Sequence, residues 1–317
     1  MKTTNEKKAA ETVLCIGLTV LDIVAMPIEN PDTWKEKQRI ERISLLAGGD
    51  AANQSIYLAA LGLHAVLNGS IGADEAGNTV KGILKSRGVD ISLLREKKDA
   101  ATGTSLVLVS PEGERRIFSV KGAHSAFDGN DLVSELPEDC AAVSLASLYG
   151  MPLAEADGLE ALFAQARSRG IPVFADLNSG RVVPMTDTIR RLLPYIDYFL
   201  PSLYDLETFT GESRPEKAAA MLRELGAANV IVKCGSRGAR VYTDAWEGTV
   251  PALPVKPLDT TGAGDCMNAA FISRILAGDH IRDACAYACA AGSLSTLSPG
   301  ANGCELSDAL IRDALSK

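Results

Sequence analysis

The chain has 317 residues, of which 46% are hydrophobic, and its formal net charge at pH 7 is -8. This length and apolar content allow one large α/β domain with an excursion as well as two domains. The acidic balance, and the lack of a Lys/Arg stripe interleaved with aromatic residues, argue against a nucleic-acid or anionic-membrane surface and leave a small molecule as the expected partner.

The sequence predicts a cytoplasmic protein. No apolar run reaches the roughly 18 to 20 residues of a membrane span, and the polar segment 1–11 is not followed by a signal-peptide core. The cysteines form no CxxC pair and mostly lie inside apolar runs, as reduced buried thiols do; they stand at positions 15, 140, 234, 266, 285, 289 and 304. Cys285 and Cys289 share a helix face, but no His or Cys partner in ligand spacing accompanies them.

The first predicted strand covers residues 13–16 and ends at Gly17. A second apolar segment, 18–26, carries a single charge at Asp22. This acid either caps a turn or pairs with an Arg, or it grips two sugar hydroxyls, because a carboxylate only accepts hydrogen bonds and can be bidentate. Residues 39–46 alternate apolar and polar side chains, which predicts an exposed strand that leaves the main sheet.

A helix is predicted from Ala51 to Gly62, after the break at Gly48-Gly49, with Asp50 as its N-cap and Asn53 in its first turn. The next strand is predicted over 66–71 and the next helix over 74–88. Strands at 104–109 and 116–120 flank a turn at 111–114, so we expect a hairpin that interrupts the β-α alternation. This hairpin should join the 40–46 strand in a small accessory sheet.

Strands and helices alternate again in the second half of the chain. Strands are expected at 142–146, 173–176, 198–200 and 230–232, and amphipathic helices near 154–169, 187–193 and 215–225. This pattern predicts a doubly wound parallel sheet. Ligands bind beyond the carboxyl ends of such strands, at a rim that would hold Gly17, Asp176, Ser202 and Gly235. A strand at 240–242 and helices at 284–296 and 306–315, the last after the cap Ser307, complete the prediction.

The stretch Asp259-Thr260-Thr261-Gly262-Ala263-Gly264-Asp265-Cys266 precedes an apolar run from 267 to 277 and carries the clearest chemistry. Its small residues let the backbone bend and present consecutive N–H groups at a helix start, where the helix dipole also favours an anion. Asp265 would then accept the proton of a hydroxyl that attacks a phosphoryl group held there. This pairing predicts a kinase, and the alternative is a glycine-rich loop in which Asp265 is an N-cap.

Several further elements coincide with one family pattern, and the chain resembles the ribokinase-like, or PfkB, carbohydrate kinases over nearly all of its length. With the stretch above, these elements are Gly48-Gly49 with Asn53, Gly72-Ala-Asp74-Glu-Ala-Gly77 with Gly88-Val89-Asp90, Asp176-Leu-Asn178, and Lys233-Cys-Gly235-Ser-Arg-Gly238-Ala239. The resemblance implies one α/β domain over 1–317, with a doubly wound, mostly parallel sheet flanked by helices. It also implies a discontinuous β-sheet lid from about 18–46 and 102–124.

The resemblance further implies an ATP-dependent sugar kinase that transfers the γ-phosphoryl group to a hydroxyl of a small carbohydrate. Asp265 would be the general base, with Gly262, Ala263 and Gly264 as the anion hole. The implied sugar-binding residues are Asp22, Gly48, Gly49 and Asn53, and those of the nucleotide are Lys233, Gly235, Ser236, Gly238 and Ser202. The lid would cover the sugar, exclude water and build a homodimer interface.

Magnesium, and in many members a monovalent cation such as K+, is also implied. The family's Asn-x-x-Glu segment appears here as Ser202-Leu-Tyr-Asp205, so Asp205 is expected to organise magnesium through water. The positions that match the monovalent cation site are Asp259, Thr261, Ser295, Ser298, Gly300 and Cys304, although the serines equally suit loop capping. Asp50 stands where many members carry Asn, which alters sugar recognition or only caps the helix.

Two other functions stay open at this point. A nucleoside kinase of the same fold is one, and the few aromatic residues of the lid segments, Trp34, Phe118 and Phe127, speak against it. A catalytically weak sugar-binding regulator is the other, motivated by the altered magnesium segment and opposed by the intact Asp265.

Two enzyme classes lack their motifs. No G-x-G-x-x-G follows the first strand, as a Rossmann dehydrogenase requires, and no G-x-x-x-x-G-K-[ST] of a P-loop kinase is present. Three basic residues, Arg116, Lys121 and His124, either contact an acidic sugar or simply face solvent.

Overall fold

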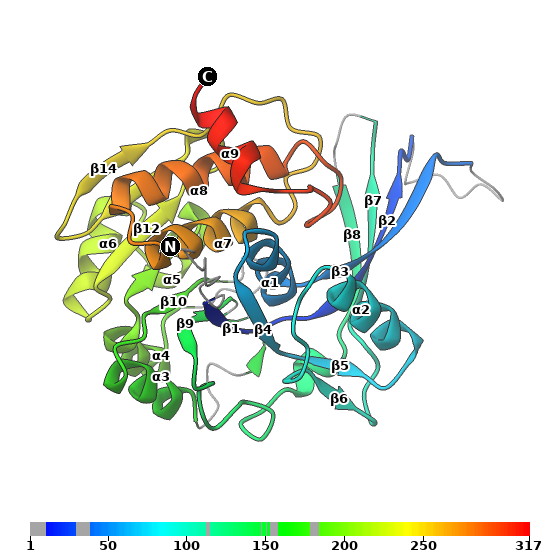
Figure 1. Cartoon of the computed structure of the whole chain (residues 1–317), viewed down its shortest axis with the longest axis horizontal. Coiled ribbons are helices and arrows are strands. Elements are labelled where there is room, and N and C mark those ends of the chain that lie inside the picture. Colours follow the sequence, from blue (N-terminus) through cyan, green and yellow to red (C-terminus); the bar gives the residue numbers. More distant parts are fainter. Residues whose placement is uncertain are drawn as a thin grey trace, which may run out of the picture.

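The computed structural model describes residues 11–29, 39–111, 115–146, 148–149, 151–152, 158–177 and 184–317. Its largest sheet has eight strands in the order β4-β1-β9-β10-β11-β12-β13-β14 (Figure 1). Pairing is parallel from β4 to β12 and antiparallel over the last two pairs. The strands are β1 (Thr12–Ile16), β4 (His64–Asn68), β9 (Cys140–Leu145), β10 (Val173–Ala175), β11 (Tyr198–Phe199), β12 (Asn229–Lys233), β13 (Ala239–Tyr242) and β14 (Glu247–Val250).

Helices cover both faces of this sheet, which confirms the predicted doubly wound architecture. Side chains alternate along a strand, so Val13 and Cys15 of β1 join one buried cluster while Leu14 and Ile16 join the other. The first cluster includes α1 (Asp50–Ala60), α2 (Glu75–Ser86), α7 (Ala263–Leu276), α8 (Ile281–Ser295) and α9 (Asp308–Leu315). The second includes α3 (Leu159–Ser168), α4 (Asp187–Leu192), α5 (Leu203–Thr210) and α6 (Pro215–Glu224).

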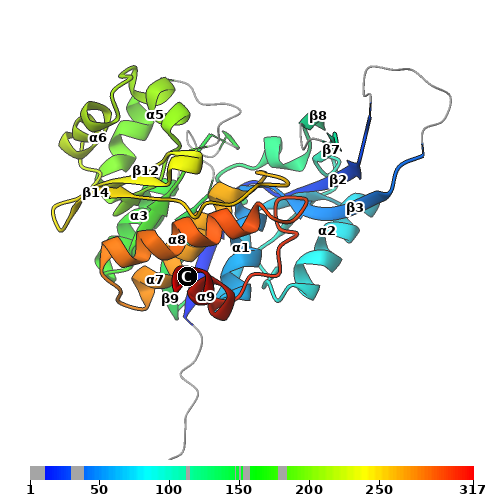
Figure 2. The same ribbon diagram turned by 90° about the horizontal axis from the view of Figure 1, so that it is seen from above.

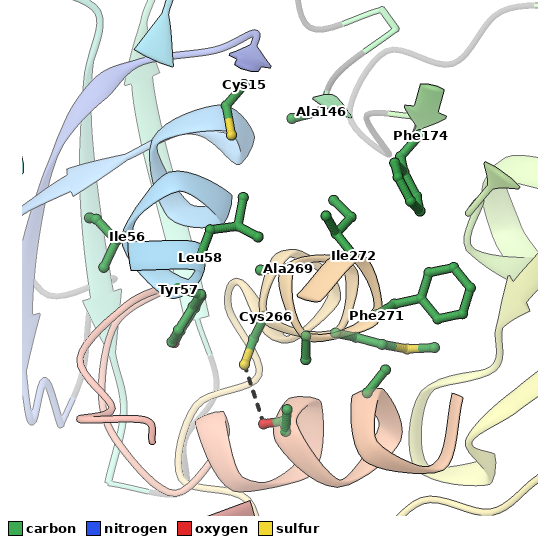
Figure 3. Close-up of a cluster of buried hydrophobic side chains, with 14 of the residues drawn as sticks. Cys15, Ile56, Tyr57, Leu58, Ala146, Phe174, Cys266, Ala269, Phe271 and Ile272 are labelled. Atoms are coloured by element: carbon green, nitrogen blue, oxygen red, sulfur yellow. Dashed lines mark hydrogen bonds between the residues drawn. The ribbon is translucent and has the colours of Figure 1, made fainter. Parts of the chain in front are cut away.

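Every residue of helix α7 from Asp265 to Ile272 is buried. The helix packs against α1 and α8, and its buried side chains belong to the same cluster as Ile56, Tyr57 and Leu58 of α1. Figure 3 shows Leu58 on the side of α1 that faces α7, whereas Ile56 points away from α7. The Cys266 thiol donates to the carbonyl oxygen of Ala291 on α8 at 3.3 Å. A helix that is apolar on all sides is stable only when it is surrounded, which explains the unbroken apolar run in its sequence.

A second sheet of four strands, here called the lid sheet, has the order β3-β2-β7-β8. Its strands are β2 (Val20–Met26), β3 (Arg42–Gly48), β7 (Thr104–Val109) and β8 (Arg115–Val120). Figure 2 shows them together at the end of the molecule opposite α5 and α6. The predicted accessory sheet is therefore confirmed, while parts of the two connections, 30–38 and 112–114, lie outside the described residues.

Several local predictions need correction. The strand predicted over 66–71 is two strands, because the chain leaves the large sheet after Asn68 and β5 (Ser70–Gly72) pairs instead with β6 (Arg95–Lys97). Helix α1 is capped by Gly49, not by Asp50. Asp50 is instead the first helical residue.

The predicted cap Ser307 is confirmed, because its side chain accepts from the amide of Leu310 at 3.2 Å. The structure also shows a cap that was not predicted: the Asp74 side chain accepts from the amide of Gly77 at 2.8 Å at the start of α2. Short 3-10 turns occupy η1 (Ala123–Ala126), η3 (Leu193–Tyr195) and η4 (Gly235–Arg237). Within the ranges given above, none of the helices combines the length and apolar character needed to cross a bilayer.

Candidate active site

The candidate site lies where the strand order of the large sheet reverses. Strand β1 pairs with β4 on one side and with β9 on the other, and both pairings are parallel. In such sheets the crevice beyond the carboxyl ends of the strands at the reversal point binds ligands. From the carboxyl end of β1 the chain enters the lid sheet, which brings the lid and the large sheet together at this crevice.

The N-terminus of α7 meets the loop that follows α8. Gly262 caps the helix at φ 70°, and a Cβ atom there would stand 2.3 Å from the carbonyl oxygen of Ala301, so only glycine fits. The first amides of a helix have no acceptor inside it. The amide of Ala263 donates to Thr260 O at 3.4 Å, and those of Gly264 and Asp265 belong to the same first turn. The N–H groups of this turn and the positive end of the helix dipole favour a bound anion.

Two side-chain amides of α1 hold the carboxylate of Asp265. The amide nitrogen of Asn53 donates to Asp265 Oδ2 at 2.8 Å, and that of Gln54 donates to Oδ1 at 3.4 Å. Burial raises the pKa of Asp265 well above its usual value, the negative charge of Asp50 raises it further, and the hydrogen bond from Asn53 opposes them. A carboxylate whose pKa is raised in this way binds a proton more readily than an exposed carboxylate does.

Asp22 of β2 lies beside Gly48 of β3. A Cβ atom on Gly48 would stand 2.0 Å from Asp22 Oδ2, so the carboxylate approaches the backbone as closely as a glycine allows. Burial raises the pKa of Asp22 to about 6, a hydrogen bond from Ser105 lowers it, and the charges of Asp50 and Asp259 raise it. Since Asp50 also acts on Asp265, the three carboxylates of Asp22, Asp50 and Asp265 make this part of the crevice acidic.

A lysine stands on the other side of the α7 terminus. The ammonium of Lys233 forms an ion pair with the buried Asp176, which also accepts from the Asn268 amide at 2.6 Å. Burial raises the pKa of Asp176, and the Lys233 charge opposes this rise. A Cβ atom on Gly264 would be 3.5 Å from Lys233 Nζ, so this positive charge lies beside the predicted anion hole.

Ser202 and Asp205 form the cap of α5. The Ser202 hydroxyl donates to Asp205 Oδ2 at 2.5 Å, and the Asp205 amide donates to the Ser202 hydroxyl at 3.1 Å. Asp205 is buried, and burial raises its pKa. Its Oδ1 has no hydrogen-bond partner within the described ranges, which leaves one carboxylate oxygen for a ligand.

The residues predicted to bind a monovalent cation lie around Asp259. Several of their side-chain oxygens already form hydrogen bonds with other groups of the protein. Asp259 accepts from the Thr261 amide at 2.9 Å, the Thr261 hydroxyl at 2.6 Å and the Gly300 amide at 2.8 Å. The Ser295 hydroxyl donates to Gly292 O at 2.9 Å. Ser298 follows in the same turn, with its amide 3.3 Å from Ser295 O, and Cys304 is a buried thiol.

The turn after β12 holds the predicted nucleotide residues. Gly235 and Ser236 are exposed, while Gly238 is buried and its carbonyl oxygen accepts from the Cys234 amide at 2.7 Å. Lys233 leads into this turn and also connects to the strand end at Ser202 through a parallel bridge. The predicted nucleotide set is therefore split between an exposed turn and the buried region beside α7.

Arg115 of the lid sheet reaches the loop before α7, a contact that sequence reasoning missed. Its guanidinium donates to the Thr261 hydroxyl and, at 3.2 Å, to the Thr260 hydroxyl, and it lies 3.6 Å from Asp259 Oδ1. Gln54 and Asn268 were also missed. A local signal existed for both, because Gln54 follows Asn53 and Asn268 lies one helical turn beyond Asp265, whereas nothing near Arg115 in the sequence points to this loop.

The basic residues considered for an acidic sugar are not gathered around Asp22. Arg116 pairs with Leu108, and residues paired directly across strands share one face of the sheet. Asp22 pairs with Ser105, on the opposite face. His124 is buried, and a Cβ atom on Gly103 would stand 2.5 Å from its ring.

Comparison with known proteins identifies the family. The model of the pfkB family carbohydrate kinases matches residues 10–308. The chain belongs to this family. It is 27% identical over 291 residues to the ribokinase of Bacillus subtilis, which covers 92% of this chain and 94% of that protein. It is 29% identical over 276 residues to the 2-dehydro-3-deoxygluconokinase of the same organism, which covers 80% of this chain and 82% of that protein.

A solved structure agrees with this assignment. The ribokinase of Arabidopsis thaliana, complexed with ribose and ATP, superposes with a TM-score of 0.79 at 25% identity and covers 98% of each chain. The pfkB family member described here is therefore a phosphotransferase with an alcohol group as acceptor, and the predicted kinase is confirmed.

Gly262→Ala tests the close approach of α7 to the 301 loop. We expect the free energy of unfolding to fall by roughly 2 kcal/mol or more, because the new Cβ is strained at positive φ and also meets the Ala301 carbonyl oxygen. Urea unfolding measures the change. Gly278→Ala is the matched control, since Gly278 has φ 84° but no atom within 4 Å of a Cβ, and only about 1 kcal/mol of strain is expected there. Equal losses in the two variants would contradict the contact.

Proposed function

We propose that this kinase transfers the γ-phosphoryl group of ATP to a hydroxyl of a small, neutral carbohydrate, with Asp265 as general base and Gly262 to Gly264 as anion hole. The observation that carries the proposal is the buried Asp265 carboxylate, which accepts a 2.8 Å hydrogen bond from Asn53 in the first turn of α7. Membership in the family supplies the reaction class. The Arabidopsis relative, complexed with ribose and ATP, supports ATP as the donor.

In the proposed reaction, the acceptor hydroxyl loses its proton to Asp265 while its oxygen attacks the γ-phosphorus of ATP. A new O–P bond forms, the bond from phosphorus to the leaving oxygen breaks, and ADP departs with the electron pair. The raised pKa of Asp265 supports this role, because a stronger base accepts the proton more readily. The helix amides and the Lys233 ammonium would stabilise the negative charge of the transferring group.

The proposed sugar ligands are Asp22, Gly48, Gly49 and Asn53. Their surroundings favour a neutral sugar over a sugar acid, because Asp22, Asp50 and Asp265 place negative charge around the acceptor and would repel an anionic substrate. Arg116 lies on the lid face opposite to Asp22, so it does not offset that charge. The nucleotide is proposed to bind Lys233, Gly235, Ser236, Gly238 and Ser202.

The lid aromatic residues favour a sugar over a nucleoside. Phe118 pairs with Leu106, and this pair lies on the lid face opposite to the Asp22 and Ser105 pair. Phe127 is fully buried in the second core cluster. Of the three rings considered from the sequence, Trp34 lies outside the described residues, and neither of the other two is placed to stack on a base at the proposed sugar site.

Magnesium is proposed to accompany ATP, with Asp205 organising it through water. The buried Asp205 Oδ1, without a partner in the residues that the structure describes, fits this role because carboxylate and water oxygens are the ligands that Mg2+ prefers. When bound, the ion would neutralise charge on the β- and γ-phosphates. The side chains expected for K+ fit less well, since Asp259 already accepts three hydrogen bonds and the Cys304 thiol is a soft donor, so we propose no step that involves K+.

The lid sheet is proposed to act with the large sheet as one catalytic domain over 1–317 and to form a homodimer with a second copy. One row of directly paired residues crosses all four strands: Leu45, Ile23, Leu106 and Phe118. Leu45 and Phe118 are 50% and 54% exposed, and Ile43 on the same face is 65% exposed. A contiguous apolar face of this kind marks an interaction surface.

The proposed reaction is tested by ADP release with a panel of neutral sugars, sugar acids and nucleosides. We expect turnover with a neutral sugar and little with acids or nucleosides. In Asp265→Asn, which keeps the size but removes the basic carboxylate, kcat should fall by about a hundredfold or more while calorimetry still detects sugar binding. Near-normal turnover in this variant would overturn the assignment of the base.

The charge of Asp50 should contribute to the pH dependence of the reaction. Burial raises the pKa of Asp265, and the charge of Asp50 raises it further. Below that pKa the base is protonated and inactive. In Asp50→Asn the pKa of Asp265 falls, and the acid limb of the kcat/KM profile should move to lower pH. A limb that stays in place, or that moves to higher pH, would show that Asp50 does not act on the base.

The dimer is tested by analytical ultracentrifugation. The pair of substitutions Leu45→Asp and Phe118→Asp places charge at both ends of this row, on its two most exposed side chains, and should yield monomers. Ile117→Asp is the matched control, because Ile117 is 53% exposed but lies on the opposite lid face, and it should leave the dimer intact. A monomeric native protein at micromolar concentration, or dissociation by the control, would refute this interface.

A further inference from the structure

Asn302 begins a chain of buried hydrogen bonds that ends at the proposed base. Its side chain is 2% exposed and lies in the loop between α8 and α9, outside every motif identified in the sequence. The Asn302 amide nitrogen donates to Ala47 O at 2.5 Å and to Asn53 Oδ1 at 2.8 Å. The Asn53 amide nitrogen then donates to Asp265 Oδ2 at 2.8 Å.

The direction of this chain follows from the backbone carbonyl at its start. A carbonyl oxygen only accepts, so the group that Asn302 turns toward Ala47 must be its NH2. The second hydrogen of that NH2 needs an acceptor, which is the oxygen of the Asn53 amide. With its oxygen engaged, Asn53 has only its own NH2 to offer Asp265. If the Asn53 amide turned over, its oxygen would face the carboxylate and repel it.

A second branch reaches the other carboxylate oxygen but sets no direction. The Ser144 hydroxyl donates to Gln54 Oε1 at 2.7 Å, and Gln54 donates to Asp265 Oδ1 at 3.4 Å. A hydroxyl both donates and accepts, so Ser144 can accommodate either orientation of Gln54. The backbone carbonyl of Ala47 thus fixes the donor direction only in the Asn302 branch. This branch also reaches Asp265 through the shorter hydrogen bond, 2.8 Å from Asn53 against 3.4 Å from Gln54.

We propose that Asn302 is a positioning residue for phosphoryl transfer: it fixes the orientation of Asn53 and thereby holds the Asp265 carboxylate in its reactive position. This inference rests on the proposed role of Asp265 as general base. Asn302 acts through Asn53, and no contact between Asn302 and substrate is required.

The charges around Asp265 determine the sign of the expected effect. Burial and the charges of Asp50 and Asp176 raise the pKa of Asp265, while Lys233 and the bond from Asn53 lower it. Burial raises the pKa of Tyr57 and of Cys266, and the charge of Asp265 in turn raises both further, so both groups stay protonated and uncharged at acidic pH. Loss of the Asn53 donor therefore raises the pKa of Asp265 further, so less of the base is ionised at a given acidic pH.

The same loop is also held by contacts that do not use the Asn302 side chain. The Tyr57 hydroxyl donates to Ala301 O at 3.0 Å, and the Arg87 guanidinium donates to the backbone oxygen of Asn302 at 2.6 Å. Tyr57→Phe therefore removes a bond to this loop, while the bonds from the Asn302 side chain to Ala47 and to Asn53 remain. It is the control that separates positioning of the base from general support of the loop.

The experiment compares pH profiles of kcat and kcat/KM for the wild type, Asn302→Leu, Asn302→Ser and Tyr57→Phe, with thermal unfolding as a check of folding. Asn302→Leu keeps the shape but removes both donors, and we expect kcat near neutral pH to fall by about tenfold or more and the acid limb to move to higher pH. Asn302→Ser keeps one hydrogen-bond donor, so it should move the acid limb of the pH profile less than Asn302→Leu does. KM for ATP should change by less than about twofold in each, because Asn302 does not contact the nucleotide turn.

Tyr57→Phe should lower thermal stability and leave the acid limb in place. The inference is overturned if the Asn302 variants keep the wild-type limb, or if Tyr57→Phe moves it to the same extent. If Asn302→Leu does not fold, the pH profile of Asn302→Ser is compared with that of the wild type instead. Failure of the proposed function is a separate outcome: the wild type would transfer no phosphoryl group to any sugar, or Asp265→Asn would retain full activity.

Discussion

The contact between α1 and the first turn of α7 is the constraint on which this site depends. It joins Asn53 to Asp265 at 2.8 Å over 212 positions of sequence. Both partners are buried, and a buried carboxylate is stable only with hydrogen-bond donors around it. The same burial that makes Asp265 costly to ionise makes it basic, so the packing of the two helices and the proposed chemistry have one physical origin.

Charge is distributed unevenly around this contact. The carboxylates of Asp22 and Asp50 lie on the side of the lid, while the Lys233 ammonium lies beside Gly264. The acidic region can accept hydrogen bonds from the hydroxyls of the proposed neutral sugar. The neighbouring positive region attracts the phosphates of ATP. Arg115 connects the lid sheet to the loop before α7, so the lid and the anion site are physically coupled.

Sequence reasoning predicted the doubly wound architecture and the accessory sheet correctly. A helix was predicted to start at the glycine-rich turn before Asp265, and α7 begins there at Ala263. It was less accurate where a residue's partner lies far along the chain. Asp50 was predicted to cap α1, yet Gly49 caps it, and the strand predicted over 66–71 divides because its second half pairs with β6. Where a strand ends depends on the neighbouring strand with which it pairs, and the local pattern of apolar residues does not reveal that neighbour.

The sequence by itself determined the alternation of strands and helices, the glycine-rich turn before Asp265 and the family, because these depend on local spacing and on backbone freedom at particular positions. Only the tertiary structure decided which groups surround the carboxylate. Gln54, Lys233 and Asn302 come from three separate elements, and Asn302 belongs to no recognisable motif. The orientation of an amide is set by its neighbours in space, so no pattern along the chain can predict it.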